Sequence, residues 1–330
     1  MIPLLTALFF GFIPCFFFAA ILYWLDRYEK EPKLLLIGVF LWGAIVAAGG
    51  SYILNSLFGI TVFGLTGSDS LASVAGATLS APFVEETLKG MAVLIVFLVF
   101  RHEFDSILDG IVYAGIAALG FAAVENSIYI WRGYLSDGWG GLATLVFIRV
   151  IMVGWQHPFY TSFIGMGLAI ARTNNNGFIK VVAPLAGWGL AMFTHSMHNF
   201  LASVPLFGDL TCLLISVLDW IGVFFMFAVI LWAGWMEHRN IINHMREEVQ
   251  LGVITPAQYS TASSNIALSI VWLTSIFSGK FRATSRFYQV IGELAHKKEQ
   301  LRKHGEEGGN SALVQKYRTE LAALSPRAQD

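Results

Sequence analysis

Residues 71–100, LASVAGATLSAPFVEETLKGMAVLIVFLVF, form an apolar run long enough to cross a bilayer, with two glutamates and a lysine inside it. About 20 apolar residues span the hydrocarbon core of a membrane. Backbone polar groups in lipid must be satisfied within the segment itself, which a helix achieves. Charged residues are costly inside such a helix, so each is a candidate for a functional role. The stretch therefore predicts a membrane helix that contains functional residues.

The composition of the whole chain also indicates a membrane protein. The 330 residues are 56% hydrophobic and 13% charged, whereas soluble domains carry about 25% charged residues. This excludes a disordered chain, a collagen, a coiled coil and a basic nucleic-acid-binding protein, so no nucleic-acid partner is expected. Cys15 and Cys212 both lie in apolar runs and predict neither a disulfide framework nor a metal site.

Apolar runs on both sides of this stretch predict an all-α, polytopic membrane protein with about seven transmembrane helices. The expected spans are residues 3–25, 34–57, 71–100, 107–131, 142–171, 181–204 and 211–236. A short separate helix could precede Pro82, and Pro158 predicts a kink in the fifth span. A signal peptide is the alternative for the first run, but that run lacks a basic n-region and a small-residue cleavage site.

The positive charges of the short loops predict the orientation, because Lys and Arg concentrate in cytoplasmic loops. The loops after the first, third and fifth spans contain Arg27, Lys30, Lys33, Arg101, Arg172 and Lys180. The loops on the opposite side contain only Arg132. The N-terminus is therefore expected outside and the C-terminus inside, in a multi-pass protein of the plasma membrane.

The chain divides by composition into a membrane-embedded domain, residues 1–236, and a helical cytoplasmic region, residues 237–330. The first contains 9 Lys+Arg and 13 Asp+Glu, and the second contains 12 and 9. In the second, residues 266–277 are apolar but too short to span and predict a buried or interfacial helix. Residues 286–303 predict a charged helix, and Asn310 or Ser311 is expected to cap a last one. The two predict a hairpin packed on the membrane domain beside anionic lipid.

Several predicted spans contain ionisable residues. They are Glu85, Glu86 and Lys89 in the third span, Glu125 in the fourth, Arg149 and His157 in the fifth, and His195 and His198 in the sixth. Glu85 and Lys89 are four residues apart and Glu86 is three from Lys89, so both glutamates can pair with the lysine. His195 and Asn199 likewise share a helix face. Asp219 and Arg132 are expected at the membrane interface, and Gly110, Gly115 and Gly120 are expected to allow close helix contact.

The depths of these groups in the bilayer predict one site. At about 1.5 Å per residue, Glu86 and His195 lie roughly 22 Å from the cytoplasmic ends of their spans, and Glu125 about 27 Å. Three helices thus place polar groups at a similar level in the outer half of a core about 30 Å thick. A dry cluster of carboxylates and imidazoles can hold a glutamate as the general base for a water molecule.

The order of these motifs resembles the PrsW family of intramembrane proteases. The pattern is Glu85-Glu-x-x-Lys89, then Gly120-Phe-x-x-x-Glu125-Asn, then His157-x-x-x-Thr161, then His195-x-x-x-Asn199. The linker at residues 26–32 and the segment 108–113 resemble that family too, so the resemblance covers roughly residues 25–202.

The related CAAX-protease and bacteriocin-processing group has Glu-Glu-x-x-x-Arg, Phe-x-x-x-His and His-x-x-x-Asn instead. Lys89 stands one position earlier than that Arg, and Glu125 stands where that group has His, which favours PrsW. The resemblance implies cleavage of single-pass, membrane-anchored proteins near the extracytoplasmic side, of which anti-sigma factors are the known type.

The resemblance and the spacing together suggest roles. Glu85 and Glu86 are expected to form the catalytic pair, one activating water and the other, with Lys89, orienting or protonating; Glu85 is the favoured base. His195 and Asn199 are expected to stabilise the oxyanion. His157 and Glu125 complete the polar shell, and the supporting residues are Lys89, Arg149 and His198.

No cofactor is expected for a glutamate protease, but zinc is an open alternative because Glu and His are zinc ligands. Its ligands would come from Glu86, Glu125, His157 and His195. Two other functions also stay open. A proton-coupled transporter could use Glu and His as a relay, although no inverted repeat is evident, and a non-catalytic scaffold could keep a protease-like fold. The protease hypothesis predicts that Ala at Glu85, Glu86 or His195 abolishes cleavage in a protein that still folds.

Overall fold

The computed structural model describes residues 1–26, 30–204, 210–306 and 309–328, and this part of the chain is helical throughout, with no strand. Internal contacts divide it into two compact units. The membrane unit comprises residues 1–25 and 31–230, and the tail unit comprises residues 26–30 and 231–330. The predicted domain boundary at 236 stays a prediction.

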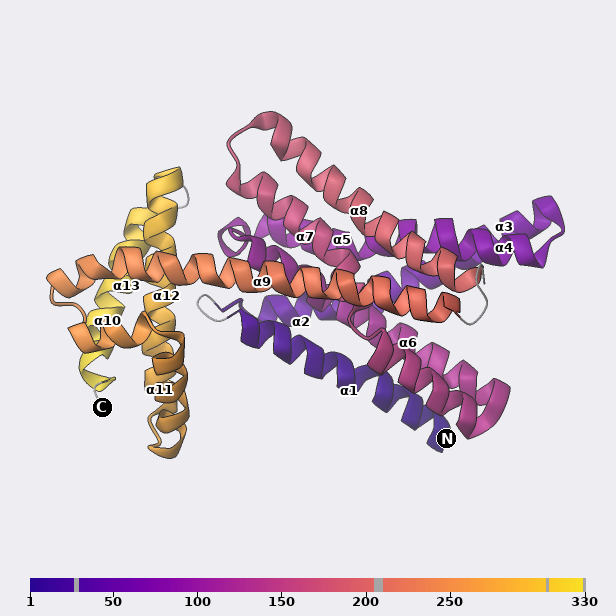
Figure 1. Ribbon diagram of the computed structural model, residues 1–330. Helices are drawn as coiled ribbons and strands as arrows, with labels where there is room; N and C mark the ends of the chain where they lie inside the picture. Colours follow the sequence, from indigo (N-terminus) through magenta and orange to yellow (C-terminus); the bar gives the residue numbers. More distant parts are fainter. Residues whose placement is uncertain (27–29, 205–209, 307–308, 329–330) are drawn as a thin grey trace. The chain divides into compact units, whose positions relative to one another are not determined.

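The membrane unit is built of long helices joined by short irregular segments (Figure 1). The helices are α1 (Ile2–Leu25), α2 (Lys33–Leu41), α3 (Ala48–Thr66), α4 (Asp69–Ala75), α5 (Ala81–Val99), α6 (Ile107–Val146), α7 (Gln156–Thr173), α8 (Gly177–Ser203) and the first part of α9 (Leu210–Gln250). π-Helical turns at Trp42–Ala47, Gly76–Ser80 and Phe147–Met152 precede α3, follow α4 and follow α6. The polytopic all-α prediction is confirmed.

Helix α6 is the centre of the membrane unit. Its residues 108–123 are all buried, and α1, α2, α5 and α7 pack around it. It begins with a capping box at Ser106 and Asp109, and the Tyr113 hydroxyl donates a hydrogen bond to Glu31. The outer helices instead expose large apolar side chains such as Phe17 and Leu185. An apolar outer surface of this kind suits a helix bundle that is surrounded by lipid.

Close helix contact at the predicted glycines is confirmed. A Cβ atom at Gly110 would lie 2.3 Å from the carbonyl oxygen of Gly165 on α7. One at Gly120 would lie 2.0 Å from the carbonyl oxygen of Phe40 on α2. Both neighbours are backbone atoms that cannot rotate away, so these positions require glycine. Gly115 instead meets a Leu22 side-chain methyl, at 2.6 Å.

Adding a methyl group at Gly110 should therefore destabilise the bundle. We expect Gly110→Ala to lower stability by about 1–3 kcal/mol, as overpacking typically does, and to lower the melting temperature measured in detergent. Gly189→Ala on α8 is the matched control, because nothing lies within 4 Å of the added carbon. Equal melting temperatures for the two variants would contradict the packing of α6 on α7.

The spans differ from their predicted bounds where tertiary contacts bend the backbone. The second span continues to Thr66 and ends at Gly67, whose φ of 65° is left-handed. A short helix, α4, does precede Pro82, as predicted. The fifth predicted span is broken at residues 153–155, and Pro158 lies in the first turn of α7 rather than at a kink within a helix. A proline is well tolerated there because first-turn amides lack intrahelical partners.

The number of spans stays a prediction. Among the described residues, five helices are long and apolar enough to cross a membrane, or six if α10 (Pro256–Ala262) and α11 (Asn265–Phe277) form one bent span. In that count residues 107–173 form a single run, although α6 and α7 are separate helices. The count also leaves out α5, which contains three charged residues within 19.

The tail unit is helical, as predicted for residues 237–330. Helices α12 (Phe281–His304) and α13 (Asn310–Leu324) pack against each other (Figure 1). Their shared core contains Phe287, Ile291 and Leu321. The predicted cap at Asn310 or Ser311 is wrong: Gly309 is the N-cap residue, and its φ of 79° is a conformation that glycine adopts without strain.

Glu299 on α12 should make the tail unit sensitive to acid. Hydrogen bonds from Arg302, His244 and Lys303 lower the pKa of Glu299 from 4.5 to about 2. A lowered folded-state pKa stabilises the fold above the unfolded pKa and loses that effect as the pH falls toward 2. Amide exchange of α12 should therefore be faster in Glu299→Gln than in wild type at pH 6, with the difference shrinking below pH 4. A difference that persists unchanged at pH 2 would contradict this assignment.

Candidate active site

Irregular backbone places the polar side chains of α5 and α7 inside the bundle. Helix α5 begins directly after the π-helical turn Gly76–Ser80, so Glu85, Glu86 and Lys89 lie in its first half. Helix α7 begins after the break at residues 153–155, which puts His157 in its first turn. Glu125 projects from α6 and His195 from α8. The structure thus brings together the groups that the sequence placed at one depth.

Glu86 is the centre of this cluster and is fully buried. Its Oε1 lies 2.5 Å from Lys89 Nζ and 2.9 Å from His195 Nδ1, and its Oε2 accepts a hydrogen bond of 2.8 Å from Thr161 Oγ1. Both carboxylate oxygens therefore have partners, drawn from α5, α7 and α8. This saturation suits a residue that orients its neighbours.

Lys89 connects Glu86 to a second carboxylate through His157. Its Nζ lies 3.3 Å from His157 Nδ1 and 4.4 Å from the centre of the Phe121 ring. His157 Nε2 lies 2.9 Å from Glu125 Oε2. An ammonium group can only donate, so His157 accepts at Nδ1 and donates from Nε2 to Glu125.

Glu125 is also paired with Arg149, and Arg149 Nε donates to Asn126 Oδ1 at 2.8 Å. The guanidinium lies over the Tyr129 ring, 4.0 Å from its centre. Arg149, predicted as a supporting residue, is thus a carboxylate partner. Charge is not balanced in this cluster, because three carboxylates of Glu85, Glu86 and Glu125 face only two permanent cations.

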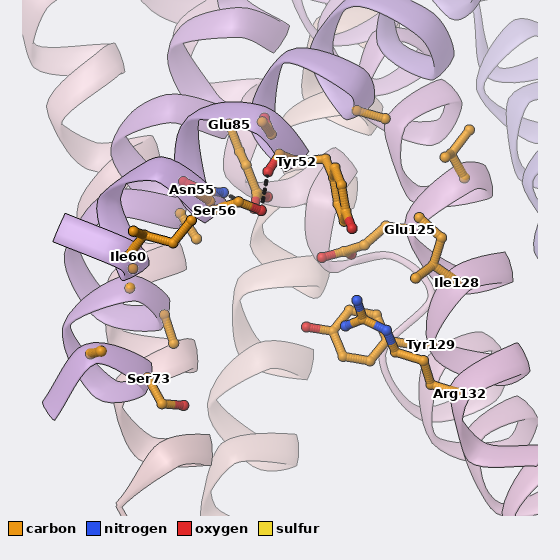
Figure 2. Close-up of a pocket in the computed structure, with 18 of the residues that line it drawn as sticks. Tyr52, Asn55, Ser56, Ile60, Ser73, Glu85, Glu125, Ile128, Tyr129 and Arg132 are labelled. Atoms are coloured by element: carbon orange, nitrogen blue, oxygen red, sulfur yellow. Dashed lines mark hydrogen bonds between the residues drawn. The ribbon is translucent and has the colours of Figure 1, made fainter. Parts of the chain in front are cut away.

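Glu85 differs from the other two glutamates in its surroundings. Its Oε1 accepts a weak hydrogen bond of 3.5 Å from Asn55 Nδ2, and its Oε2 is buried without a hydrogen-bond partner among the described residues. Glu85 lines two cavities, of about 750 and 380 Å³. Figure 2 shows its side chain at one end of the larger cavity, with Glu125 on the opposite wall. A buried oxygen without a partner beside a cavity is a natural place for a reacting group.

His195 is held so that one ring nitrogen faces Glu85. Its Nδ1 is engaged by Glu86, its ring stacks on Tyr160 at 5.0 Å, and its Nε2 lies 3.9 Å from Glu85 Oε2. One ligand atom each of Glu85, His157 and His195 lie within 4.8 Å of one another. These converging donors differ from the predicted metal set, since Glu85 takes the place of Glu86 and Glu125.

Asn199 lies on the wall of the smaller cavity, but its amide is engaged elsewhere. Its Nδ2 donates to the Ala77 carbonyl at 2.9 Å, and the neighbouring Ser196 Oγ donates to the Thr78 carbonyl at 2.5 Å. Both carbonyls belong to the π-helical turn that precedes α5, and both accept hydrogen bonds from residues of α8. A π-helical turn leaves carbonyls for other donors, so Asn199 helps to hold the turn that positions Glu85.

A second polar cluster surrounds His198, which the sequence indicated as a supporting residue without indicating its partners. Asp219 on α9 is buried, not at an interface as predicted. It accepts hydrogen bonds from Gln156 and, at 3.2 Å, from the Tyr160 hydroxyl, and lies 2.9 Å from His198 Nδ1. Because Tyr160 stacks on His195, this cluster supports the first. The only signal in the sequence was an acidic residue within an apolar run.

Comparison with known proteins places this site in a family. The sequence model described as "PrsW family intramembrane metalloprotease" matches residues 31–233, which include every residue of both clusters. Proteins named "Protease PrsW" are similar to this chain. The one from Clostridioides difficile (strain 630) is 39% identical over 106 residues, covering 32% of this chain and 42% of that protein.

Two longer matches extend over most of the relatives' length. The protein from Oceanobacillus iheyensis is 27% identical over 202 residues, covering 61% of this chain and 83% of that protein. The one from Bacillus subtilis (strain 168) is 26% identical over 222 residues, covering 67% and 88%. No solved structure matches the chain. Because the family model matches more than half of this chain, the chain belongs to the PrsW family of intramembrane metalloproteases.

Proposed function

We propose that the protein is an intramembrane endopeptidase in which Glu85 activates a water molecule for attack on a peptide carbonyl. The observation that carries this proposal is the Oε2 atom of Glu85, which is buried, has no hydrogen-bond partner among the described residues and belongs to a residue lining two cavities. Membership of the family supports peptide hydrolysis as the reaction.

The surrounding groups supply the remaining steps. Glu85 takes a proton from the attacking water as the carbon–oxygen bond forms, and delivers it to the leaving amine as the carbon–nitrogen bond breaks. His195, oriented by Glu86, presents Nε2 toward the reacting atoms. Lys89 Nζ lies 4.0 Å from Glu85 Oε2 and adds positive charge where the oxyanion develops. Asn199 holds the turn before α5, so its predicted oxyanion role passes to His195 and Lys89 in this proposal.

The residues present also fit a metal ion. Two imidazoles and a carboxylate are a common donor set for catalytic zinc, and the carboxylate–imidazole contact of Glu86 with His195 resembles the outer-shell support of zinc ligands. Glu85, His157 and His195 would hold the ion. A bound zinc would polarise the carbonyl and lower the pKa of water. The excess negative charge of the cluster is balanced by such an ion or by a proton.

The proposed substrates are single-pass proteins of the plasma membrane cut near the extracytoplasmic side, in the manner of anti-sigma factors. Comparative proteomics of cells that make the wild-type or the His195→Ala protein tests this. Fragments of single-pass membrane proteins, cut near the outer surface, should be present only with the wild type. Identical fragment patterns in the two strains would contradict the proposal. Metal analysis of the purified wild-type and His157→Ala proteins separates the two catalytic types.

A further inference from the structure

The larger cavity is an open groove between α3 and α6 that leads to Glu85. Residues at helical spacing line it on both sides, along α3 from Ala48 to Phe63 and along α6 from Phe121 to Arg132, and α4 lines it as well. Figure 2 shows Asn55, Ser56 and Ser73 on one side and Tyr129 and Arg132 on the other. We call this cavity the α3–α6 groove.

The dimensions of the groove suit a short extended peptide. The lining face of α6 rises about 16 Å and that of α3 about 22 Å, at 1.5 Å per residue. An extended chain rises about 3.3 Å per residue, so the groove accommodates about five to seven residues. Its volume of about 750 Å³ is large enough for several side chains.

The polar residues of the groove fit a peptide better than a lipid tail. Asn55, Ser56, Ser73 and Tyr129 all line it. An unwound peptide within a membrane needs partners for its backbone N–H and C=O groups, since water is absent. An acyl chain has no use for such groups, so the lining indicates a polypeptide occupant.

Arg132 is the charged residue of the groove whose role is unexplained. It is exposed, and no carboxylate lies within ion-pair distance of it among the described residues. Asp69 also lines the groove, but it stands in the first turn of α4, where a negative charge stabilises the helix N-terminus. By contrast, Lys89 and Arg149 are both paired with glutamates.

We propose that the α3–α6 groove binds a substrate segment in extended conformation, and that Arg132 selects an acidic side chain about three residues from the scissile bond. This inference rests on the proposed protease function. Glu125 lines the groove on the wall opposite Glu85 and so marks the level of the scissile bond on α6. Arg132 lies seven residues after Glu125 on the same face of α6, which corresponds to about 10 Å along the helix. That length equals about three residues of an extended chain. A carboxylate there would complete a charge pair that the protein leaves open.

A charge-swap experiment tests the inference. Once a cleaved protein is known, substrates carrying Asp, Ala or Lys at each position within four residues of the cut are presented to wild-type, Arg132→Gln and Arg132→Glu proteins in liposomes of neutral lipid. With wild type, Asp at one position about three residues from the cut should raise kcat/KM about fivefold over Lys, the size expected for one exposed ion pair. Arg132→Gln should remove that preference and Arg132→Glu should reverse it. Lys180→Glu is the control, because Lys180 is exposed and outside the groove.

The outcomes separate this inference from the proposed function. Equal cleavage of all substrates by wild type and both Arg132 variants would overturn the role of Arg132 and leave the protease intact. No cleavage by wild type would overturn the proposed function instead. An Arg132 effect that appears only with anionic lipid, and is the same for every substrate, would mean that the residue binds a lipid headgroup, and would also overturn the inference.

Discussion

Glu85→Gln should lower kcat by about 10²–10⁴-fold, because a positioned general base typically contributes that much. Glutamine has nearly the same shape, so the fold and the cavities are retained while the base is lost. The KM should change little, since Glu85 reaches the α3–α6 groove only at one end. Single-turnover cleavage of a single-pass substrate in liposomes measures the effect.

Asn55→Ala is the matched control for this variant. It removes the 3.5 Å hydrogen bond to Glu85 Oε1 and the 2.8 Å hydrogen bond that Asn55 Oδ1 accepts from Ser80 Oγ, and it keeps the carboxylate itself. Its kcat should fall much less than that of Glu85→Gln. Wild-type kcat in a folded Glu85→Gln protein would show that another residue activates the water.

Glu86→Ala should combine loss of activity with loss of stability. It leaves the ammonium of Lys89 buried without its nearest carboxylate and frees His195 and Thr161. Removing one partner of a buried ion pair typically costs about 3–5 kcal/mol. We expect a large decrease in melting temperature in detergent, much greater than for Glu85→Ala. The structure therefore adds a folding penalty to the loss of cleavage that the sequence predicted.

A double variant separates charge from shape. Glu86→Leu with Lys89→Met replaces both charges by apolar groups of similar volume, which is often neutral for stability. It should recover most of the melting temperature lost in Glu86→Ala but none of the activity. A Glu86→Ala protein as stable as wild type would contradict the position of Glu86 at the centre of the buried cluster.

The spacing of residues along the sequence predicted the contacts that form within a single helix. The pairing of Lys89 with Glu86 follows from three residues on one helix and is confirmed at 2.5 Å. The apolar runs predicted a polytopic all-α fold, and the similar depths of Glu86, Glu125 and His195 predicted their proximity. Each of these inferences needs only the helical rise and the thickness of a bilayer.

Contacts between helices could not be predicted in the same way. Asn199 binds the Ala77 carbonyl because the backbone there forms a π-helical turn. No residue type in that segment predicts such a turn. Asp219 was expected at the membrane interface, yet it is buried and accepts hydrogen bonds from Gln156 and Tyr160. The different hydrogen bonding of Glu85 and Glu86 also depends on tertiary packing. Thr161 of α7 and His195 of α8 contact the carboxylate of Glu86, and these contacts form only when the helices pack together.

The oxygen of the attacking water can be followed to show whether Glu85 activates that water. A membrane protein found to be cut in cells is reconstituted with the purified wild-type protein in water enriched in ¹⁸O, and the new C-terminal carboxylate is weighed by mass spectrometry. Cleavage by Glu85-activated water predicts one ¹⁸O atom per product after a single turnover, and no product with Glu85→Gln. An unlabelled product, or labelled product formed by Glu85→Gln at the wild-type rate, would contradict it.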